Sequence, residues 1–556
     1  MSVRSGLPAL LLLCGLATLP FLDVPAPPAT LELELPRRAA VGYSNIHPGD
    51  YVGPETCAEC HPKKYALWRG HPHSSMNLDA SPETVLGDFS GLELEYAGGA
   101  VRFEQTVSGY GMTLKRGGET RSYRVTRTVG SRFTQMYIGV QTLGPEALDD
   151  PIYRNEGKLP FGYWLDRKAW FPEVYFDSDC PPEYQPDGTL SLPSERAHRT
   201  TWRDNCIYCH NTYPYEERLR AGRGTTGFPE EDLSLSATVA PGDPPGLSPA
   251  RLVTLGISCE SCHFGGREHA IGGKAIRFVP SSPALQFPKG ERARGRDDPY
   301  VVNSICSQCH FSRGVSSYPN GAGVWNSREA VDLANGGCAS QIKCTDCHDP
   351  HVPSVPGGGP THSAHVQTCL GCHPGLQSDE HSQHPAEVSC LDCHMPRIVQ
   401  GLEAVVRTHQ ISSPGDPRML AAGAPNACNL CHLERSIEWT VAALKIGWAQ
   451  TIEPEPSWQE PYGGRLSAPV GQAWISSPEP NYRLVAADAY SRSPLGQARL
   501  QNLIRALDDP QAVNRMFGLF ALERVLGRRL SKEEYAPVAS PATRREQVAK
   551  LLARYP

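Results

Sequence analysis

This sequence of 556 residues lacks the features that mark nucleic-acid-binding and membrane-spanning proteins. It has no block of basic residues and a formal net charge of −6, which argues against a nucleic-acid partner. After residue 22, no segment is apolar enough to cross a bilayer. Its mean hydropathy is −0.38, and its 51 Pro and 52 Gly are typical of a loop-rich chain. The length suggests several domains, but the composition predicts a polypeptide wrapped around something other than a large conventional core.

The one long apolar run lies at the N-terminus. It extends from Leu7 to Leu22, follows Arg4 and precedes the small residues of the segment 24–29. This pattern predicts an export signal over residues 1–29. An uncleaved membrane anchor is the alternative, although the run is shorter than the ~20 residues that a span requires. We therefore expect a periplasmic or otherwise exported protein, which an uncleaved N-terminus would attach to the membrane.

Cysteine is abundant, and its arrangement is specific. Sixteen of the nineteen cysteines form eight copies of the pattern Cys-x-x-Cys-His. This pattern is the attachment signature of c-type haem, in which both thiols bond to the porphyrin and the histidine is an axial ligand of the iron. A zinc site needs no trailing histidine, and a thioredoxin-like site needs one cysteine pair, so neither explains eight copies. The sequence therefore predicts eight covalently bound c-type haems. The residues of motifs 1 to 8 are Cys57, Cys60 and His61; Cys206, Cys209 and His210; Cys259, Cys262 and His263; Cys306, Cys309 and His310; Cys344, Cys347 and His348; Cys369, Cys372 and His373; Cys390, Cys393 and His394; and Cys428, Cys431 and His432.

The positions of the motifs predict the domain organisation. A first haem segment covers residues 30–83, and a region without motifs covers 84–175. In that region, alternating runs such as 92–96 and 101–107 are separated by glycines and predict antiparallel hairpins. This β-rich insertion would serve as a scaffold, shield a haem or dock a partner. The multihaem core covers 176–435, where gaps of 47, 38, 25, 21 and 38 residues between motifs are too uneven for a tandem repeat.

The last part of the chain, residues 436–556, carries no motif and has a helical pattern. Ser436 to Trp448 reads as one helix, and apolar residues near 500–507 recur about every 3.6 residues. Asp508-Asp509-Pro510 predicts the start of another helix over 511–526. Such paired helices resemble HEAT repeats, which serve either as docking surfaces or as a plain cap. We expect a mainly α and irregular multihaem cytochrome c fold, with a small antiparallel β insertion and a C-terminal α-helical repeat region.

Eleven histidines lie outside the motifs, which is more than a second axial ligand for every iron requires. An iron with two histidines is saturated and suits electron transfer, whereas an iron with one can bind a small molecule. After motif 1, His71 or His73 can turn back towards a nearby iron. Glycines before His269 permit a tight reversal, while His351 lies only three residues after His348 and is expected to serve an adjacent haem. The eleven are His47, His71, His73, His198, His269, His351, His362, His365, His381, His384 and His409.

These surroundings resemble the doubled-CxxCH and cytochrome c-554-like type of multihaem cytochrome c. The likeness is greatest to octahaem bacterial members with a C-terminal helical-repeat region, and it covers about residues 50 to 440. In one place the chain departs from these relatives, because Phe264-Gly-Gly stands where Gly-Pro-Gly is usual after the third motif. The residues that carry the resemblance are Trp68 and His73 after motif 1, Val85 to Phe89, motif 3 with His269, motif 5 with His351, motif 7 with Pro396 and His409, and Pro425-Asn-Ala before Cys428.

The resemblance implies bis-histidine haems in stacked and perpendicular pairs. It implies distal ligand roles for His73, His269, His351, His409 and one of His381 and His384. His198, upstream of Trp202 and motif 2, is a further candidate ligand. Related octahaem families include hydroxylamine oxidases and nitrite or tetrathionate reductases, which raises an enzyme as an alternative without assigning a substrate or a catalytic residue.

Two functions of different classes follow. The first is an electron carrier that accepts electrons from a redox protein or a quinol-oxidising partner and passes them on. The second is a multihaem oxidoreductase with nitrite-, hydroxylamine- or tetrathionate-type chemistry at one open haem. A purely structural role, based on the helical C-terminus as a docking surface, leaves eight haems unexplained. Cys180 and Cys338 could form a disulfide in an oxidising compartment, or both could remain free thiols. Alternatively, Cys338 could be an iron ligand near motif 5.

Overall fold

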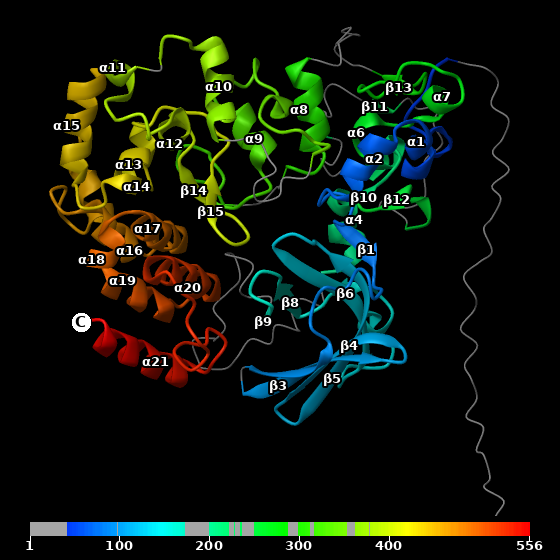
Figure 1. Ribbon diagram of the computed structural model, residues 1–556, viewed down its shortest axis with the longest axis horizontal. Helices are drawn as coiled ribbons and strands as arrows, with labels where there is room; N and C mark the ends of the chain where they lie inside the picture. Colours follow the sequence, from blue (N-terminus) through cyan, green and yellow to red (C-terminus); the bar gives the residue numbers. More distant parts are fainter. Residues whose placement is uncertain are drawn as a thin grey trace, which may run out of the picture. The chain divides into compact units, whose positions relative to one another are not determined.

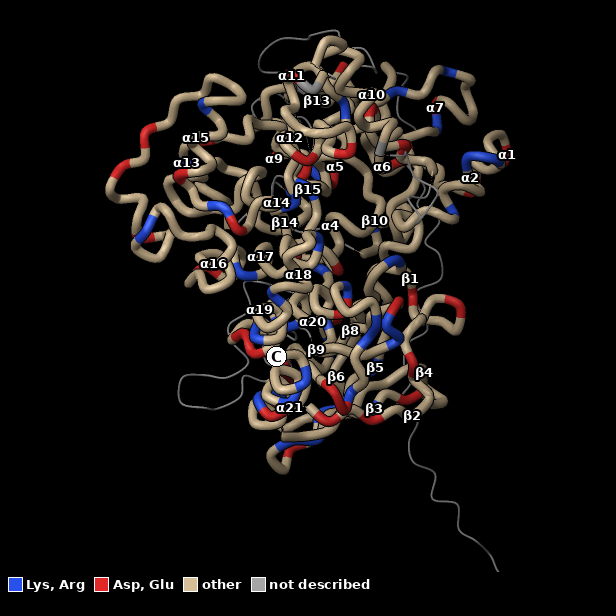
Figure 2. The backbone as a smooth tube through the Cα atoms, turned by 60° about the vertical axis from the view of Figure 1, so that its left-hand side comes forward, with Lys and Arg blue, Asp and Glu red and all other residues tan. Residues whose placement is uncertain are grey.

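The computed structural model describes residues 42–96, 98–172, 200–221, 227, 234–235, 249–286, 298–311, 316–352, 362–376 and 378–556. The predicted signal segment 1–29, Cys180 and His198 lie outside these residues. Within them, no helix combines the length and apolar character needed to cross a bilayer. Acidic and basic residues are interspersed along both the strands and the helices (Figure 2).

The predicted β-rich region is a nine-stranded antiparallel sheet, which is larger than the small insertion that the sequence suggested. Its strand order is β2-β3-β4-β5-β6-β8-β9, with β1 paired to β5 and β7 paired to β6 (Figure 1). Gly117 and Gly118 form the two-residue turn between β4 and β5 with φ of 58° and 82°, as a type I′ hairpin turn requires. The strands are β1 (Asn77–Asp79), β2 (Ser90–Tyr96), β3 (Gly99–Thr106), β4 (Gly109–Arg116), β5 (Glu119–Val129), β6 (Thr134–Leu143), β7 (Gly157–Lys158), β8 (Phe161–Trp164) and β9 (Ala169–Pro172).

An aromatic cluster forms the core of the sheet. Phe103 stacks on Trp170 with ring centroids 3.7 Å apart and planes 2° apart, and Phe89 meets Trp170 edge-on at 5.0 Å. On β3, Val101 and Phe103 are fully buried and Arg102 between them is exposed. The predicted period-two pattern of this region is therefore confirmed.

The haem motifs lie on short helices and turns rather than on long elements. A break at His61 separates α1 from α2, which begins at Pro62. Three further strand pairs lie among these helices: β10 (Asn211–Thr212) with β12 (Thr254–Leu255), β11 (Ser234–Leu235) with β13 (Leu285–Gln286), and β14 (Arg397–Gln400) with β15 (Val405–Arg407). The helices are α1 (Pro54–Cys60), α2 (Pro62–Arg69), α4 (Ile207–His210), α5 (Tyr215–Ala221), α6 (Glu260–His263), α7 (Arg267–Ala270), α8 (Pro299–Ser307), α9 (Glu329–Ala334), α10 (His362–Cys372), α11 (Asp379–Ser382), α12 (Cys390–His394), α13 (Pro417–Ala421) and α14 (Ala427–Cys431).

The helices predicted after motif 8 are present. Ser436 caps α15 by accepting a hydrogen bond from the Trp439 amide, and the apolar residues near 500–507 are buried. Asp509 accepts from the Gln511 amide just before α20 begins. A HEAT-type repeat remains a prediction. The helices are α15 (Ile437–Trp448), α16 (Val470–Ile475), α17 (Pro480–Arg492), α18 (Leu495–Ala498), α19 (Leu500–Arg505), α20 (Ala512–Leu526) and α21 (Pro541–Arg554).

The turn between β8 and β9 docks on helix α20. Arg167 reaches Glu523 at 2.6 Å and lies over the Phe520 ring at 4.0 Å. Trp164 meets the same ring edge-on at 6.1 Å. This contact joins the sheet to the C-terminal helices.

Candidate haem-binding sites

Each motif folds as one helical turn. In six motifs the histidine amide donates to the carbonyl of the first cysteine, at N···O distances of 2.8–3.0 Å. The histidines of the other two motifs end α4 and α12. This turn brings two thiols three residues apart and the adjacent imidazole to one side of the helix, which is the arrangement that a thioether-bound porphyrin requires.

Six motif histidines face a second imidazole from outside the motifs. Their ring centroids are 6.0–6.5 Å apart. The pairs, with centroid distance and interplanar angle, are His61–His269 (6.2 Å, 10°), His310–His73 (6.5 Å, 58°), His263–His351 (6.1 Å, 28°), His348–His409 (6.3 Å, 34°), His348–His365 (6.0 Å, 58°), His394–His381 (6.3 Å, 3°) and His432–His384 (6.2 Å, 40°).

This separation fits an iron between the two rings. Two collinear metal–nitrogen bonds of about 2 Å, with about 1 Å from each nitrogen to its ring centre, give a separation of roughly 6 Å. Among the described residues, no three His, Cys, Asp or Glu side chains converge as a site for a bare metal ion. The histidines converge in pairs instead.

In several of these histidines, Nδ1 makes a hydrogen bond to a nearby oxygen. A carbonyl oxygen can only accept, so Nδ1 must donate, and Nε2 is left with the lone pair that binds iron. Such contacts also orient the ring. The Nδ1 contacts are His269 to the Lys274 carbonyl (2.7 Å), His384 to the Ser382 carbonyl (2.6 Å), His394 to the Ser412 carbonyl (2.9 Å), His310 to Glu329 (3.0 Å) and His351 to Asp349 (3.2 Å).

His348 has two neighbouring imidazoles. The Nε2 of His365 lies 3.0 Å from the Cys347 carbonyl, so this ring uses Nε2 as a hydrogen-bond donor. His409 makes no such contact with the motif and faces His348 at 6.3 Å. The geometry therefore favours His409 as the distal residue of motif 5, with His365 beside it.

The structure places both His381 and His384 opposite motif histidines, where the resemblance implied one of the two. Gln383 between them has a φ of 54°, a left-handed conformation that turns the chain, so that His381 faces His394 and His384 faces His432. Sequence reasoning missed this double use. The His-x-x-His spacing was its signal.

Motifs 2 and 6 differ from the others. Among the residues that the structure describes, neither His210 nor His373 has a second imidazole at the spacing of the other pairs. His198, the candidate ligand for motif 2, lies outside those residues, so its role stays a prediction.

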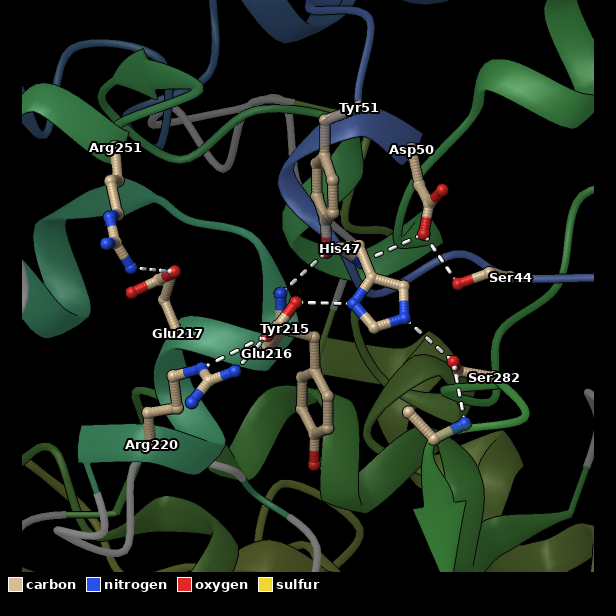
Figure 3. Close-up of polar contacts among 11 residues, drawn as sticks. Ser44, His47, Asp50, Tyr51, Tyr215, Glu216, Glu217, Arg220, Arg251 and Ser282 are labelled. Carbon is tan, nitrogen blue, oxygen red and sulfur yellow. Dashed lines mark hydrogen bonds and ion pairs between the residues drawn. The ribbon is translucent and has the colours of Figure 1, made fainter. Parts of the chain in front are cut away.

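His47 belongs to a structural network instead of a haem pair. Its Nδ1 pairs with the buried carboxylate of Glu216, and its Nε2 lies 2.8 Å from the Ser282 hydroxyl, so both ring nitrogens are engaged (Figure 3). Arg220 contacts the same carboxylate at 2.5 Å. Burial opposes ionisation of Glu216, but hydrogen bonds from His47 and Arg220 outweigh it and lower the pKa.

His71 also lies apart from the haem pairs. Its Nδ1 accepts a hydrogen bond from the His73 amide at 3.1 Å, and the two rings are 4.4 Å apart. This distance leaves no room for an iron between them. The His362 side chain lies outside the described residues.

Thiols of different motifs influence one another, which indicates which motifs are neighbours. In each of three thiol pairs, interaction between the two thiols raises the pKa of one and lowers the pKa of the other, and these pairs join motif 1 to motif 3, motif 2 to motif 4, and motif 4 to motif 5. Because these sulfurs would carry the edges of attached porphyrins, haems bound at the paired motifs would be neighbours. Cys338 forms no disulfide with any described cysteine, and Cys180, its predicted alternative partner, lies outside the described residues. The three thiol pairs are Cys57–Cys259, Cys209–Cys309 and Cys306–Cys344.

Comparison with known proteins gives a weak structural likeness and no more. No family model matches the chain, and no curated protein matches it. The outer cell wall cytochrome OcwA is 15% identical, with a TM-score of 0.36, over 91% of this chain and 98% of that one. The octaheme sulfite reductase MccA of Wolinella succinogenes is 14% identical, with a TM-score of 0.27, over 92% of this chain and 86% of that one. These scores are too low to support any conclusion about the present chain.

Proposed function

We propose that this chain is an exported octahaem c-type cytochrome that carries electrons along a row of mostly bis-histidine haems. The observation that carries the proposal is the set of histidine pairs at 6.0–6.5 Å, each joining a motif histidine to one from elsewhere in the chain. A haem iron held by two histidines supplies one-electron chemistry without an open site.

The chain's own residues support this function in two ways. The contacts of Nδ1 with fixed acceptors pre-orient the rings, so that little rearrangement accompanies a change of charge. The distal histidines also come from neighbouring motifs: His269 follows motif 3 but faces motif 1, and His351 follows motif 5 but faces motif 3. This exchange interlocks adjacent sites and keeps them close. A redox protein or a quinol-oxidising enzyme would be the partner, with the C-terminal helices as a candidate docking surface.

A second function rests on motifs 2 and 6. Because His210 and His373 have no second imidazole among the described residues, one of these irons is the candidate for small-molecule chemistry of the nitrite, hydroxylamine or tetrathionate type. The thiols of Cys209 in motif 2 and Cys309 in motif 4 shift each other's pKa, so motif 4 is a neighbour from which electrons could reach motif 2.

Electron paramagnetic resonance of the oxidised holoprotein tests the proposal. An electron carrier gives low-spin ferric signals that nitrite, hydroxylamine and cyanide leave unchanged. A high-spin signal that these ligands abolish would favour the second function over the first.

A further inference from the structure

The C-terminal end of helix α15 contacts the short segment that carries His381 and His384. The Trp448 indole Nε1 donates to the His381 carbonyl at 2.7 Å. The same indole lies against the His384 ring, with centroids 6.4 Å apart and planes 23° apart. One side chain therefore contacts both histidines that face motifs 7 and 8.

This segment has little rigidity of its own. Helix α11 has only four residues, too few to be stable alone. Ser382 donates to the His384 carbonyl at 2.8 Å, and Gln383 donates to the Glu380 carbonyl at 2.6 Å. These bonds shape the turn but lie within the segment, so they do not tie it to the rest of the protein.

Helix α15 is well placed to hold the segment. Ile437, Thr440 and Leu444 are buried, so one side of the helix is anchored in the core. Trp439 on the same helix tilts against His432 with centroids 4.8 Å apart. Helix α15 thus touches both imidazoles of the motif 8 pair, His432 through Trp439 and His384 through Trp448.

We propose that Trp448 is a positioning residue for the haem sites of motifs 7 and 8. Its indole N–H fixes the backbone at His381, and its ring holds the His384 imidazole at the distance from His432 that an iron requires. Loss of the indole frees the segment, and the two distal histidines leave their irons. This inference rests on the proposed function, because it presupposes haem at both motifs.

The alternative is that Trp448 only covers apolar surface, since it is 37% exposed at a helix end. Two substitutions separate these roles. Trp448→Ala removes both contacts, whereas Trp448→Phe keeps an aromatic ring beside His384 and removes only the N–H donor. Ile446→Ala is the matched control, because Ile446 lies on the same helix and is 87% exposed.

Electron paramagnetic resonance and visible spectra of the oxidised variants, with haem content measured in parallel, make the test. In Trp448→Ala we expect the two irons of motifs 7 and 8 to change from low-spin to high-spin, and added imidazole to restore them. In Trp448→Phe we expect only the signal of the near-parallel pair, His381 with His394 at 3°, to change. Ile446→Ala should match the wild type.

Wild-type low-spin spectra in Trp448→Ala, with eight haems retained, would overturn the inference and leave the proposed function intact. The same spectral change in Ile446→Ala would overturn it too, because it would show a general loss of packing. A wild-type protein without haem would instead contradict the proposed function. Should Trp448→Ala fail to accumulate, an unchanged spectrum in Trp448→Phe would by itself remove the role assigned to the N–H.

Discussion

For a single histidine, the position of the Nδ1 proton decides which ring nitrogen is available to a metal. In His269, His384 and His394 a backbone carbonyl accepts from Nδ1, whereas in His310 the acceptor is the carboxylate of Glu329. A charged acceptor makes the imidazole a stronger donor to iron than a neutral one does. The electronic properties of the haems should therefore differ from motif to motif.

Substitution of Glu329 tests this difference. Glu329→Gln removes the negative charge beside His310 Nδ1, so the ferric state of the motif 4 haem loses stabilisation and its reduction potential should rise. A shift on the order of 60 mV corresponds to about tenfold in a one-electron equilibrium. Spectroelectrochemical titration of the holoprotein measures it. Glu104→Gln, in an exposed pair on the sheet, is the control, and a lowered or unchanged potential in Glu329→Gln would contradict the argument.

The two imidazoles near His348 lead to a second prediction. His409→Ala should leave the iron of motif 5 without a distal ligand, so one of eight irons should turn from low-spin to high-spin. His365→Ala should leave the low-spin signal of motif 5 unchanged, because the His365 Nε2 is engaged by the Cys347 carbonyl. Magnetic circular dichroism of both oxidised variants shows which substitution changes the spin state of the motif 5 iron. A change in His365→Ala but not in His409→Ala would make His365 the ligand.

Among the elements of the fold, helix α5 illustrates how a buried charge is stabilised. Glu216 is 8% exposed and is paired with both His47 and Arg220 (Figure 3). Removing one partner of a buried ion pair leaves the remaining buried charge uncompensated. This lowers stability far more than the loss of a surface ion pair does.

Glu216→Gln should accordingly lower the free energy of unfolding by about 3 kcal/mol at neutral pH. Because the folded-state pKa of Glu216 lies below its usual 4.5, its stabilisation is present above that pH and is lost as the pH falls through the lowered value. The variant should therefore show a smaller loss of stability on acidification than the wild type. Denaturant titrations followed by far-ultraviolet circular dichroism, at neutral and acid pH, compare the two, and equal stability at neutral pH would refute the role given to the network.

The contact of the β8–β9 turn with α20 also depends on a largely buried ion pair. Arg167→Ala removes the ion pair with Glu523 and the contact with the Phe520 ring, and should cost about 2 kcal/mol, because both charged side chains are largely buried. Arg529→Ala removes a nearby exposed pair with Asp166 and should cost less than about 1 kcal/mol. Thermal denaturation of both variants measures the difference. A larger effect for Arg529 than for Arg167 would show that this docking contact is unimportant.

Considering the whole molecule, the sequence predicted local features better than long-range ones. Alternation at 92–96 and 101–107 identified the strands, and the apolar spacing near 500–507 identified buried helices, because both depend on neighbours in sequence. The size of the sheet was not predicted, since β1 pairs with the distant strand β5, and the short strands β7 and β8 both pair with β6. The pairing of His269 with motif 1 likewise joins distant parts of the chain, which spacing does not encode.

The central claim is that eight Cys-x-x-Cys-His turns hold covalent haem, with most irons between two histidines. The most direct measurement is the haem content of the purified chain, by the pyridine haemochrome assay and by intact mass under denaturing conditions, after export in a host with cytochrome maturation. The account predicts eight haems for each polypeptide. Protein that carries no haem and has free thiols at the motif cysteines would contradict it.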